Sequence, residues 1–357
     1  MSIVRQTEGG VLRVKQSVRT LLSVCRTAFG LGLLVYLGVS GVINWSTLFG
    51  LLKAWPIALI ALALLLIDMG VTSARLCLLL KPHDLHLTWL SSLRLTLIGT
   101  FFNICLPGAT GGDVVRIYYA TANNPGRRTE VATVMVLDRM IGMFALAVVP
   151  LIIAPLFPQL VETVAVLPIL LWAGASIASV MATGMLVCSI PRLRYSRLVV
   201  WGLQTLPLGH QIERIFDTVH VYRRHLGTML VSVAMSLLVH LIMIAVVLLV
   251  VQATNPDGIS WYMALLIPLG FMANSLPLTP GGLGVGEAAF DKLFQLVSLS
   301  GGAEALLGWR MLMMLIGMSG LVFYLRGGGQ FIHRRVPPGK DWRGDMLCDA
   351  ETMLEGV

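Results

Sequence analysis

Charged residues are scarce in this sequence: Asp, Glu, Lys and Arg make up 12% of the 357 residues, whereas hydrophobic residues make up 56%. The mean hydropathy of +0.82 lies far above the range of soluble proteins. This composition excludes a soluble globular protein and predicts an all-α polytopic membrane protein. The net charge of +8 then reflects basic cytoplasmic loops and contact with anionic lipids. We expect membrane lipids as partners, and no nucleic acid.

Motifs for several kinds of chemistry are also missing. The five cysteines show no C-x-x-C spacing, which argues against a disulfide framework and against a zinc site. There is no Walker-type G-x-x-x-x-G-K-[ST] sequence, so ATP is not the direct energy source. No cluster of His, Asp and Glu has metal-ligand spacing, and no nucleophile–base pair stands out. We expect no cofactor, no metal and no enzymatic activity.

Long apolar runs predict six full membrane spans. A basic segment, residues 1–26, precedes the first run at 27–44, which has no A-x-A-like cleavage site and is therefore interpreted as a span rather than a signal peptide. Each of the other runs is long enough to cross a hydrocarbon core of about 30 Å. These runs are 55–80, 131–155, 163–190, 228–252 and 304–326.

Two stretches between these runs carry the same break in an otherwise apolar sequence. Both fit Leu-Pro-x-x-x-Gly-Gly-x-x-Val, beginning at Leu106 and at Leu276. Proline removes a backbone donor, and the glycine pairs at 111–112 and 281–282 let the chain leave helical geometry, so each stretch is predicted to be a broken helix. Lipid tolerates free backbone groups only where protein or a watery cavity surrounds them. Two such breaks in corresponding positions of two halves point to a transporter-type site.

The segments after the breaks, 113–122 and 284–297, are too short to cross a membrane. We therefore predict that each broken region is a re-entrant hairpin that enters and leaves on one side. If residues 88–106 crossed fully, Arg127 and Arg128 would lie outside, against the Lys/Arg bias of cytoplasmic loops. The hairpin interpretation keeps the basic connections on the cytoplasmic side.

The predicted fold is an inverted repeat of span, span, re-entrant hairpin, span. The first unit covers 27–155 and the second 163–326, with a cytoplasmic or interfacial linker at 191–226. Each unit crosses three times, so the second is inverted, and the broken tips should meet near the midplane. The N-terminal segment and the tail, 327–357, are both predicted to be cytoplasmic, in a protein of the cell inner membrane.

Nine charged residues occur inside the apolar segments. They are Asp68, Arg75, Arg94, Asp113, Arg116, Asp138, Arg139, Glu287 and Arg310. A charge at a helix centre costs about 2.5–3.5 kcal/mol, so nine unpaired charges would exceed the typical net stability of about 5–15 kcal/mol. Most of them must be paired, hydrated or near an interface. For Asp68, a functional and a structural role both stay open.

Arg139 and Arg310 lie at similar depths in the last span of each unit, approached from opposite sides. In an inverted repeat they would flank one cavity. A guanidinium fits phosphate oxygens, and helix N-termini after the Gly-Gly pairs add free N–H groups. The pattern favours a site for an anionic head group. The alternative is that Asp138 and Arg139 pair with neighbours and only hold the bundle together.

Further residues near the breaks complete the predicted site. Asp113 could cap the short helix or contact the substrate, and Arg116 can pair with it one turn later. Asn103 and Asn274 could satisfy freed backbone groups. The predicted substrate-binding residues are Asn103, Gly111, Gly112, Asp113, Arg116, Asp138, Arg139, Gly281, Gly282, Glu287 and Arg310.

Three motifs resemble those of the lysylphosphatidylglycerol synthase transmembrane, or flippase-like, family: FFNICLPGATGGDVVRIYYA at 101–120, VLDRMIG at 136–142 and LPLTPGGLGVGEAAF at 276–290. The resemblance extends over about residues 20–326. It implies an integral membrane protein that moves lipids between leaflets. Two-domain members also carry a soluble synthase domain, which we do not expect here, so the resemblance does not imply aminoacyl transfer. Phospholipids, isoprenoid-derived lipids and glycolipids are the substrate classes that it implies.

Three functions remain open from the sequence. The leading hypothesis is a flippase or transporter for a lipid with an anionic head group. The alternatives are an intramembrane enzyme that acts on a lipid phosphate, with Asp113 or Asp138 in its site, and a structural partner of a lipid-modifying complex. Lipid-synthesising enzymes are expected partners in the last case.

Overall fold

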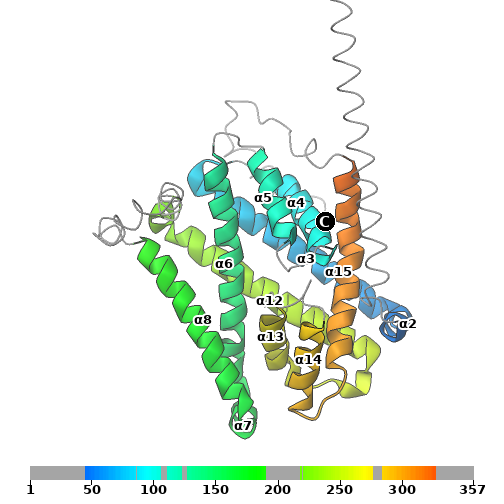
Figure 1. Ribbon diagram of the computed structural model, residues 1–357. Helices are drawn as coiled ribbons and strands as arrows, with labels where there is room; N and C mark the ends of the chain where they lie inside the picture. Colours follow the sequence, from blue (N-terminus) through cyan, green and yellow to red (C-terminus); the bar gives the residue numbers. More distant parts are fainter. Residues whose placement is uncertain are drawn as a thin grey trace, which may run out of the picture.

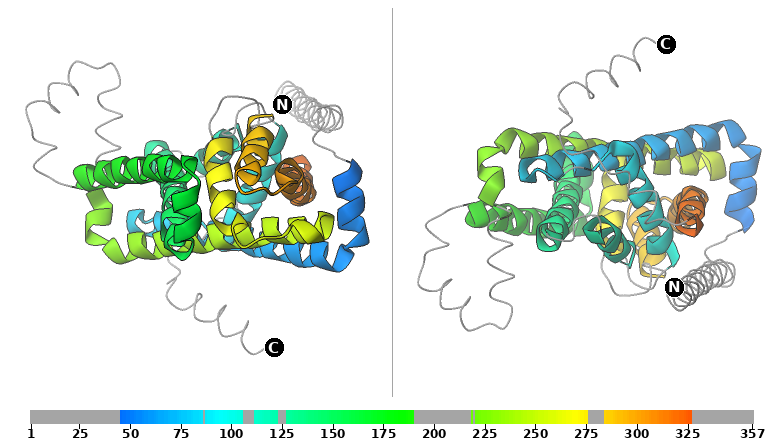
Figure 2. Two further views of the ribbon diagram at one scale, coloured as in Figure 1. Left: turned by 90° about the horizontal axis from the view of Figure 1, so that it is seen from below. Right: turned by 90° about the horizontal axis from the view of Figure 1, so that it is seen from above.

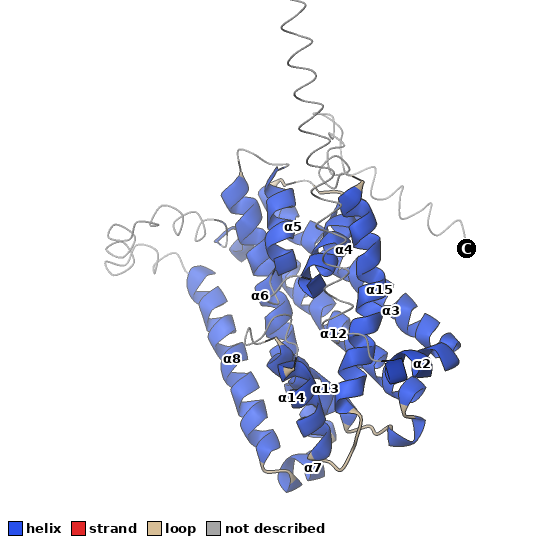
Figure 3. Cartoon of the chain, turned by 45° about the vertical axis from the view of Figure 1, so that its right-hand side comes forward, coloured by secondary structure: helices blue, strands red, loops and turns tan. Residues whose placement is uncertain are grey.

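The computed structural model describes residues 45–85, 87–105, 111–122, 127–189, 218, 220–275 and 284–326. All regular elements within these ranges are helices, and no strand occurs among them (Figures 1 and 3). In the described part of the chain, five helices are long and apolar enough to cross a membrane: α3 (Trp55–Leu80), α6 (Arg128–Ile153), α8 (Val166–Ser189), α12 (Leu226–Thr254) and α15 (Gly302–Leu325). The chain is therefore a multi-pass membrane protein.

These five helices confirm five of the six predicted spans, with boundaries that differ by a few residues. The predicted span at 27–44 lies outside the described residues, as do most of the linker at 191–226 and the tail. Two short helices, α2 (Trp45–Lys53) and α7 (Pro158–Thr163), are not among the predicted elements. Both are shorter than a span, so hydropathy over a span-length window does not detect them.

The two broken regions each contain a pair of short helices. The first pair is α4 (Trp89–Cys105) and α5 (Gly111–Ala122), and the second is α13 (Met263–Asn274) and α14 (Val285–Gln295). The helices of each pair pack against each other. Residues 106–110 and 276–283, which include Gly281 and Gly282, lie outside the described residues. The structure therefore confirms helical arms on both sides of each predicted break.

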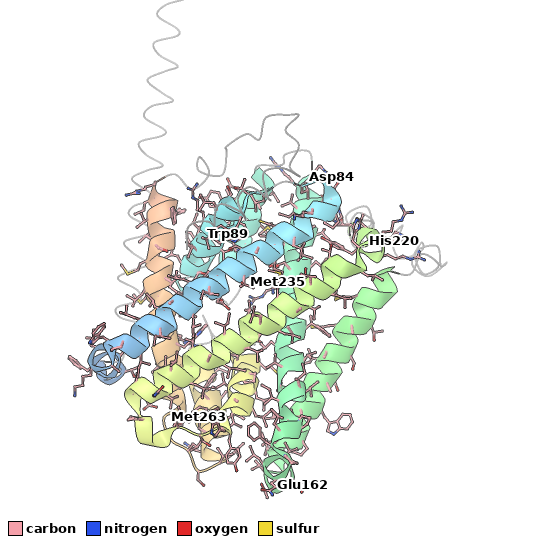
Figure 4. The ribbon with its side chains drawn as sticks, turned by 180° about the vertical axis from the view of Figure 1, so that it is seen from behind. Asp84, Trp89, Glu162, His220, Met235 and Met263 are labelled. Atoms are coloured by element: carbon pink, nitrogen blue, oxygen red, sulfur yellow. The ribbon has the colours of Figure 1, made fainter. Side chains whose placement is uncertain are left out.

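The long helices form a bundle around these pairs. Helices α3 and α12 run antiparallel and side by side, obliquely across the bundle (Figure 4). Helix α15 packs along α4, and α6 packs along α13, so each of these two helices contacts a short helix from the other half of the chain. The contact between α15 and α4 is close, because a Cβ atom built on Gly320 would lie 2.0 Å from the Leu97 carbonyl oxygen.

The connections fall at two ends of the bundle. Asp84 and His220 lie near one end, whereas Glu162 and Met263 lie near the other (Figure 4). The end of α5 and the beginning of α6 lie at the same end of the bundle as the end of α3 (Figure 1). The short pairs lie toward opposite ends, with α4 and α5 nearer the Asp84 end and α13 and α14 nearer the other (Figures 1 and 2).

Large apolar side chains lie both in the interior of the bundle and on its outer surface. The largest buried cluster joins α6, α12, α13, α14 and α15 with the first residues of α7 and α8, and its fully buried side chains include Leu265, Phe290 and Phe294. Helix α8, by contrast, exposes large apolar side chains: Trp172 is 74% exposed and Val180 is 72% exposed. Apolar surface of this kind is stable in contact with lipid tails, which agrees with a membrane-spanning helix.

Candidate functional site

The beginning of α5 is held tightly against α4. The Asn103 side-chain oxygen accepts a hydrogen bond of 2.8 Å from the Gly112 backbone N–H. This N–H belongs to the first turn of α5, where donors have no partner within the helix. A Cβ atom built on Gly112 would lie 1.9 Å from the Gly99 carbonyl oxygen. Glycine is therefore required at position 112, and Asn103 has the predicted role of satisfying a freed backbone group.

Three charged side chains gather at this point. Asp113, the third residue of α5, lies 3.5 Å from Nη1 of Arg116 and 3.5 Å from Nε of Arg139 on α6. The pairing of Asp113 with Arg116 was predicted from their spacing, and it is present. Gly99 makes room for this arginine, because a Cβ atom at position 99 would lie 2.4 Å from Arg116 Cδ.

The contacts of these side chains are incomplete. The Arg139 side chain is 45% exposed, and its only polar contact with the described residues is the 3.5 Å approach to Asp113. The buried Nε of Arg116 and Oδ2 of Asp113 have no hydrogen-bond partner among these residues. A guanidinium with unused donors can bind a further anion. This group therefore has unused hydrogen-bonding capacity on both arginines.

A second group lies at the beginning of α14. Glu287, the third residue of that helix, accepts a 2.8 Å hydrogen bond from the Gly284 backbone N–H. Its other oxygen lies 2.7 Å from Nη1 of Arg310 on α15. Nη2 of Arg310 also donates a 2.8 Å hydrogen bond to the Asn274 side-chain oxygen. Through this bond Asn274 orients the arginine; its predicted contact with freed backbone groups concerns residues 276–283, outside the described residues.

The two groups are built from the same parts in the same order. In each, an asparagine lies near the end of the first short helix, a glycine is second in the next short helix, and an acid is third. The pairs Gly112–Asp113 and Gly286–Glu287 occupy these positions. Each acid pairs with an arginine of the following long helix.

This correspondence differs from the one that the sequence motif gives. Alignment of the two Leu-Pro-x-x-x-Gly-Gly stretches places Leu283 opposite Asp113, which leaves Glu287 without an acidic counterpart. The helix beginnings instead match Glu287 with Asp113. Helix α14 begins at Val285, after its Gly-Gly pair, whereas α5 begins at Gly111, within its Gly-Gly pair. A sequence comparison that allowed a shift of a few residues after the glycines would have matched the two acids.

Asp138 has a different environment from Arg139, its neighbour in sequence. Asp138 is 3% exposed and pairs with Nε of Arg75 on α3 at 2.7 Å. Nη1 of Arg75 donates to the Ser236 hydroxyl on α12, so this ion pair joins α3, α6 and α12. The predicted site set included Asp138 but not Arg75. The near balance of intramembrane charges suggested that such a partner existed, but it did not identify which arginine it was.

The phenol of Tyr222 borders this region just before α12. Its hydroxyl donates to the Leu79 carbonyl oxygen. Burial, reinforced by the negative charge of Asp138, raises the pKa of Tyr222. The phenol therefore stays neutral and acts as a hydrogen-bond donor that ties the beginning of α12 to α3.

Among the described residues, no group of three or more His, Cys, Asp and Glu side chains could hold a metal ion. The two groups consist of arginines, acids, asparagines and helix N-termini, which are residue types and elements that can bind an anion by charge and hydrogen bonds. In comparisons with known proteins, the family model described as the lysylphosphatidylglycerol synthase TM region matches residues 24–326. No curated protein and no solved structure matches the chain.

Proposed function

The chain belongs to the family of the lysylphosphatidylglycerol synthase TM region, and from this premise we propose that it is a lipid flippase. It moves a phospholipid, isoprenoid-derived lipid or glycolipid with an anionic head group between the leaflets of the cell inner membrane. It catalyses no chemical change in the lipid. The match with the family supports a role linked to lipids in a membrane, and the charged groups at the two breaks support the choice of substrate.

The observation that carries the proposal is the exposure of Arg139 and the length of its contact with Asp113. A half-exposed guanidinium beside the N-terminus of α5, whose one polar contact among the described residues is at 3.5 Å from Asp113, can take a phosphate oxygen. Arg116, whose Nε lacks a hydrogen-bond partner among the described residues, adds a second donor next to it. Charge-assisted hydrogen bonds of this kind contribute about 1.5–3 kcal/mol each. Arg310 is the corresponding arginine of the other half of the chain, where Glu287 and Asn274 hold it.

We further propose that the two halves are inverted repeats with re-entrant hairpins. The shared order of asparagine, glycine, acid and arginine supports this relationship, as does the placement of the short pairs toward opposite ends of the bundle (Figure 1). Both termini would then be cytoplasmic. Labelling of single cysteines tests this topology: Asn124→Cys should react from the cytoplasmic side and Ser300→Cys from the opposite side. Reaction of the 124 position from outside intact cells would rule out the first hairpin.

The flippase proposal is tested with purified protein in liposomes that contain a head-group-labelled anionic lipid. The wild-type protein should bring the label in the protected inner leaflet within reach of an external quencher. Arg139→Ala should lower this rate at least tenfold per folded molecule, and Arg139→Lys should recover little, because lysine lacks the planar fork.

Arg127→Ala is the matched control. Arg127 has a similar exposure of 42%, precedes the same helix and also pairs with an acid, Glu130, but it lies away from the break. The control should transport at the wild-type rate. If folded Arg139→Ala also does so, Arg139 does not form the site. Mass spectrometry of the same lipids separates the alternatives: an altered lipid would indicate an enzyme, and an unchanged, immobile lipid would indicate a structural partner.

A further inference from the structure

The acids of the membrane-spanning region are not all paired. Asp113, Asp138 and Glu287 each have an arginine within 3.5 Å. Asp68 makes no ion pair within the described part of the chain, and its Oδ1 is buried without a hydrogen-bond partner there. It is 8% exposed and lies in the middle of α3. The proposed lipid site does not use this side chain.

Charged and titratable side chains occur on each helix that packs against α3. They are Lys53 on α2, Arg94 on α4, Arg128, Glu130, Asp138 and Arg139 on α6, His240 on α12, Glu304 and Arg310 on α15, and Lys81 and His83 on the short 3-10 helix Lys81–His83 that follows α3. Arg75 lies two turns after Asp68 on the same helix, α3. Seven residues make nearly two full helical turns, so Arg75 lies on the same face of α3 as Asp68, about 10 Å further along the helix. Its guanidinium binds Asp138 and Ser236.

An ionised carboxylate without a partner is costly in an apolar interior, so such a group takes up a proton instead. We propose that Asp68 is a proton-binding site that couples lipid movement to the proton gradient across the membrane. With its proton bound, Asp68 is neutral, and Arg75 stays with Asp138. After the proton leaves, the carboxylates of Asp68 and Asp138 compete for one guanidinium.

This competition connects the proton site to the lipid site. Asp138 is adjacent in sequence to Arg139, so a change in the bond between Arg75 and Asp138 acts on the same turn of α6. The proton enters from one aqueous side and leaves to the other, and no bond of the lipid changes. The coupling rests on the proposed lipid movement, whereas proton binding by Asp68 does not.

Infrared spectroscopy tests proton binding independently of transport. In lipid vesicles at neutral pH, the wild-type protein should show the carbonyl stretch of a protonated carboxyl group. This band should be lost in Asp68→Asn and kept in Asp84→Asn, a control at an exposed acid. If Asp68→Asn does not fold, Asp68→Glu should keep the band at a shifted frequency. A band that is absent from the wild-type protein, or that stays unchanged in a folded Asp68 variant, overturns the proposal.

Transport under an imposed pH difference tests the coupling. With one proton per lipid, each pH unit should shift the distribution of the labelled lipid between leaflets up to about tenfold. Asp68→Asn should abolish this shift and still exchange lipid down its own gradient, whereas Asp84→Asn should behave as the wild-type protein.

The outcomes separate the two proposals. If lipid exchange by the wild-type protein does not depend on the pH difference, or depends on a sodium gradient instead, the coupling is overturned. The flippase proposal is not affected by that result. If the wild-type protein moves no lipid at all, the flippase proposal fails and the coupling fails with it. The infrared result then decides proton binding by Asp68 alone.

Discussion

The α4–α5 and α13–α14 pairs use the same kinds of residues but leave their arginines in different states. In the first, Asn103 binds the backbone of α5, and the one polar contact of the half-exposed Arg139 with the described part of the chain is at 3.5 Å from Asp113. In the second, Asn274 and Glu287 both hold Arg310, at 2.8 and 2.7 Å, and the arginine side chain is 9% exposed. The asparagine thus supports the backbone in one half and the charge in the other.

This difference separates two uses of a buried charge. An arginine with two short contacts and little exposure stabilises the fold, because its removal leaves a buried carboxylate without a partner. An arginine with one long contact and high exposure contributes little to stability, so its unused donors are available to a ligand. We therefore expect the two arginines, which the sequence presents as counterparts, to differ in how strongly they affect unfolding.

The largest expected effect is that of Arg310→Ala. Removing this arginine leaves the Glu287 carboxylate, which is 14% exposed, with its Gly284 hydrogen bond but without the ion pair, so the free energy of unfolding should fall by about 3–5 kcal/mol. Thermal unfolding in detergent, followed by size-exclusion chromatography, measures the loss. Replacing both partners, Glu287→Gln with Arg310→Met, should restore most of it. A loss under about 1 kcal/mol in Arg310→Ala would contradict the stabilising role.

Removing the asparagine should also destabilise the protein more in the α13–α14 pair than in the α4–α5 pair. Asn274→Ala removes a hydrogen bond to a charged group and should cost about 1.5–3 kcal/mol, whereas Asn103→Ala removes a bond to a neutral N–H and should cost about 0.5–1.5 kcal/mol. Unfolding midpoints of the two variants, measured side by side, give the order. Equal losses would show that the two asparagines play equivalent roles.

The glycines that precede the acids provide a third comparison. Gly112→Ala places a methyl group 1.9 Å from the Gly99 carbonyl oxygen, a backbone atom that cannot move without shifting α4, and should cost about 1–3 kcal/mol. In Gly286→Ala the nearest atom is Asn274 Oδ1 at 2.2 Å, on a side chain that can rotate only if it gives up its hydrogen bond to Arg310. Gly286→Ala should therefore cost about as much as Asn274→Ala, and the fractions of these two variants recovered folded from the membrane should be similar. A Gly286→Ala protein that is far less stable than Asn274→Ala would show that the asparagine cannot move aside.

Arg139→Ala should have the smallest effect on stability. The exposed, long contact with Asp113 contributes at most about 1 kcal/mol, similar to that of Arg127 and Glu130. The variant should therefore be recovered folded and yet transport poorly, which makes the loss of transport attributable to binding. An unfolding loss as large as that of Arg310→Ala would show that Arg139 serves the fold instead.

The sequence predicted much of the helical framework. Hydropathy located α3, α6, α8, α12 and α15 within a few residues of their ends. The Pro and Gly pattern located both breaks, and the i, i+3 spacing predicted the contact of Asp113 with Arg116. Hydropathy did not reveal α2 or α7, whose lengths fall below that of a span. The predicted inversion of the two halves and the orientation of the termini stay predictions.

The partners of most charges could not be predicted, because helical periodicity places a residue on a face without identifying the helix opposite. Asp138 and Arg139 are neighbours in sequence, but successive residues lie about 100° apart around a helix. Asp138 therefore meets Arg75, and Arg139 meets Asp113. Because periodicity does not identify the opposite helix, the sequence also cannot distinguish Asp68 from the other acids. Asp68 has no ion-pair partner among the described residues, whereas Asp113, Asp138 and Glu287 each have one.

The amino-acid sequence by itself determined that this protein spans a membrane, where its helices break and which charges must be accommodated in an apolar interior, because these properties depend on local composition and spacing. Only the tertiary structure decided how the charges are shared. The packing of α6 beside α5, and of α15 beside α14, gives each acid its arginine. The depth at which each pair is buried depends on neighbouring helices, and it is this packing that leaves Arg139 exposed and encloses Arg310.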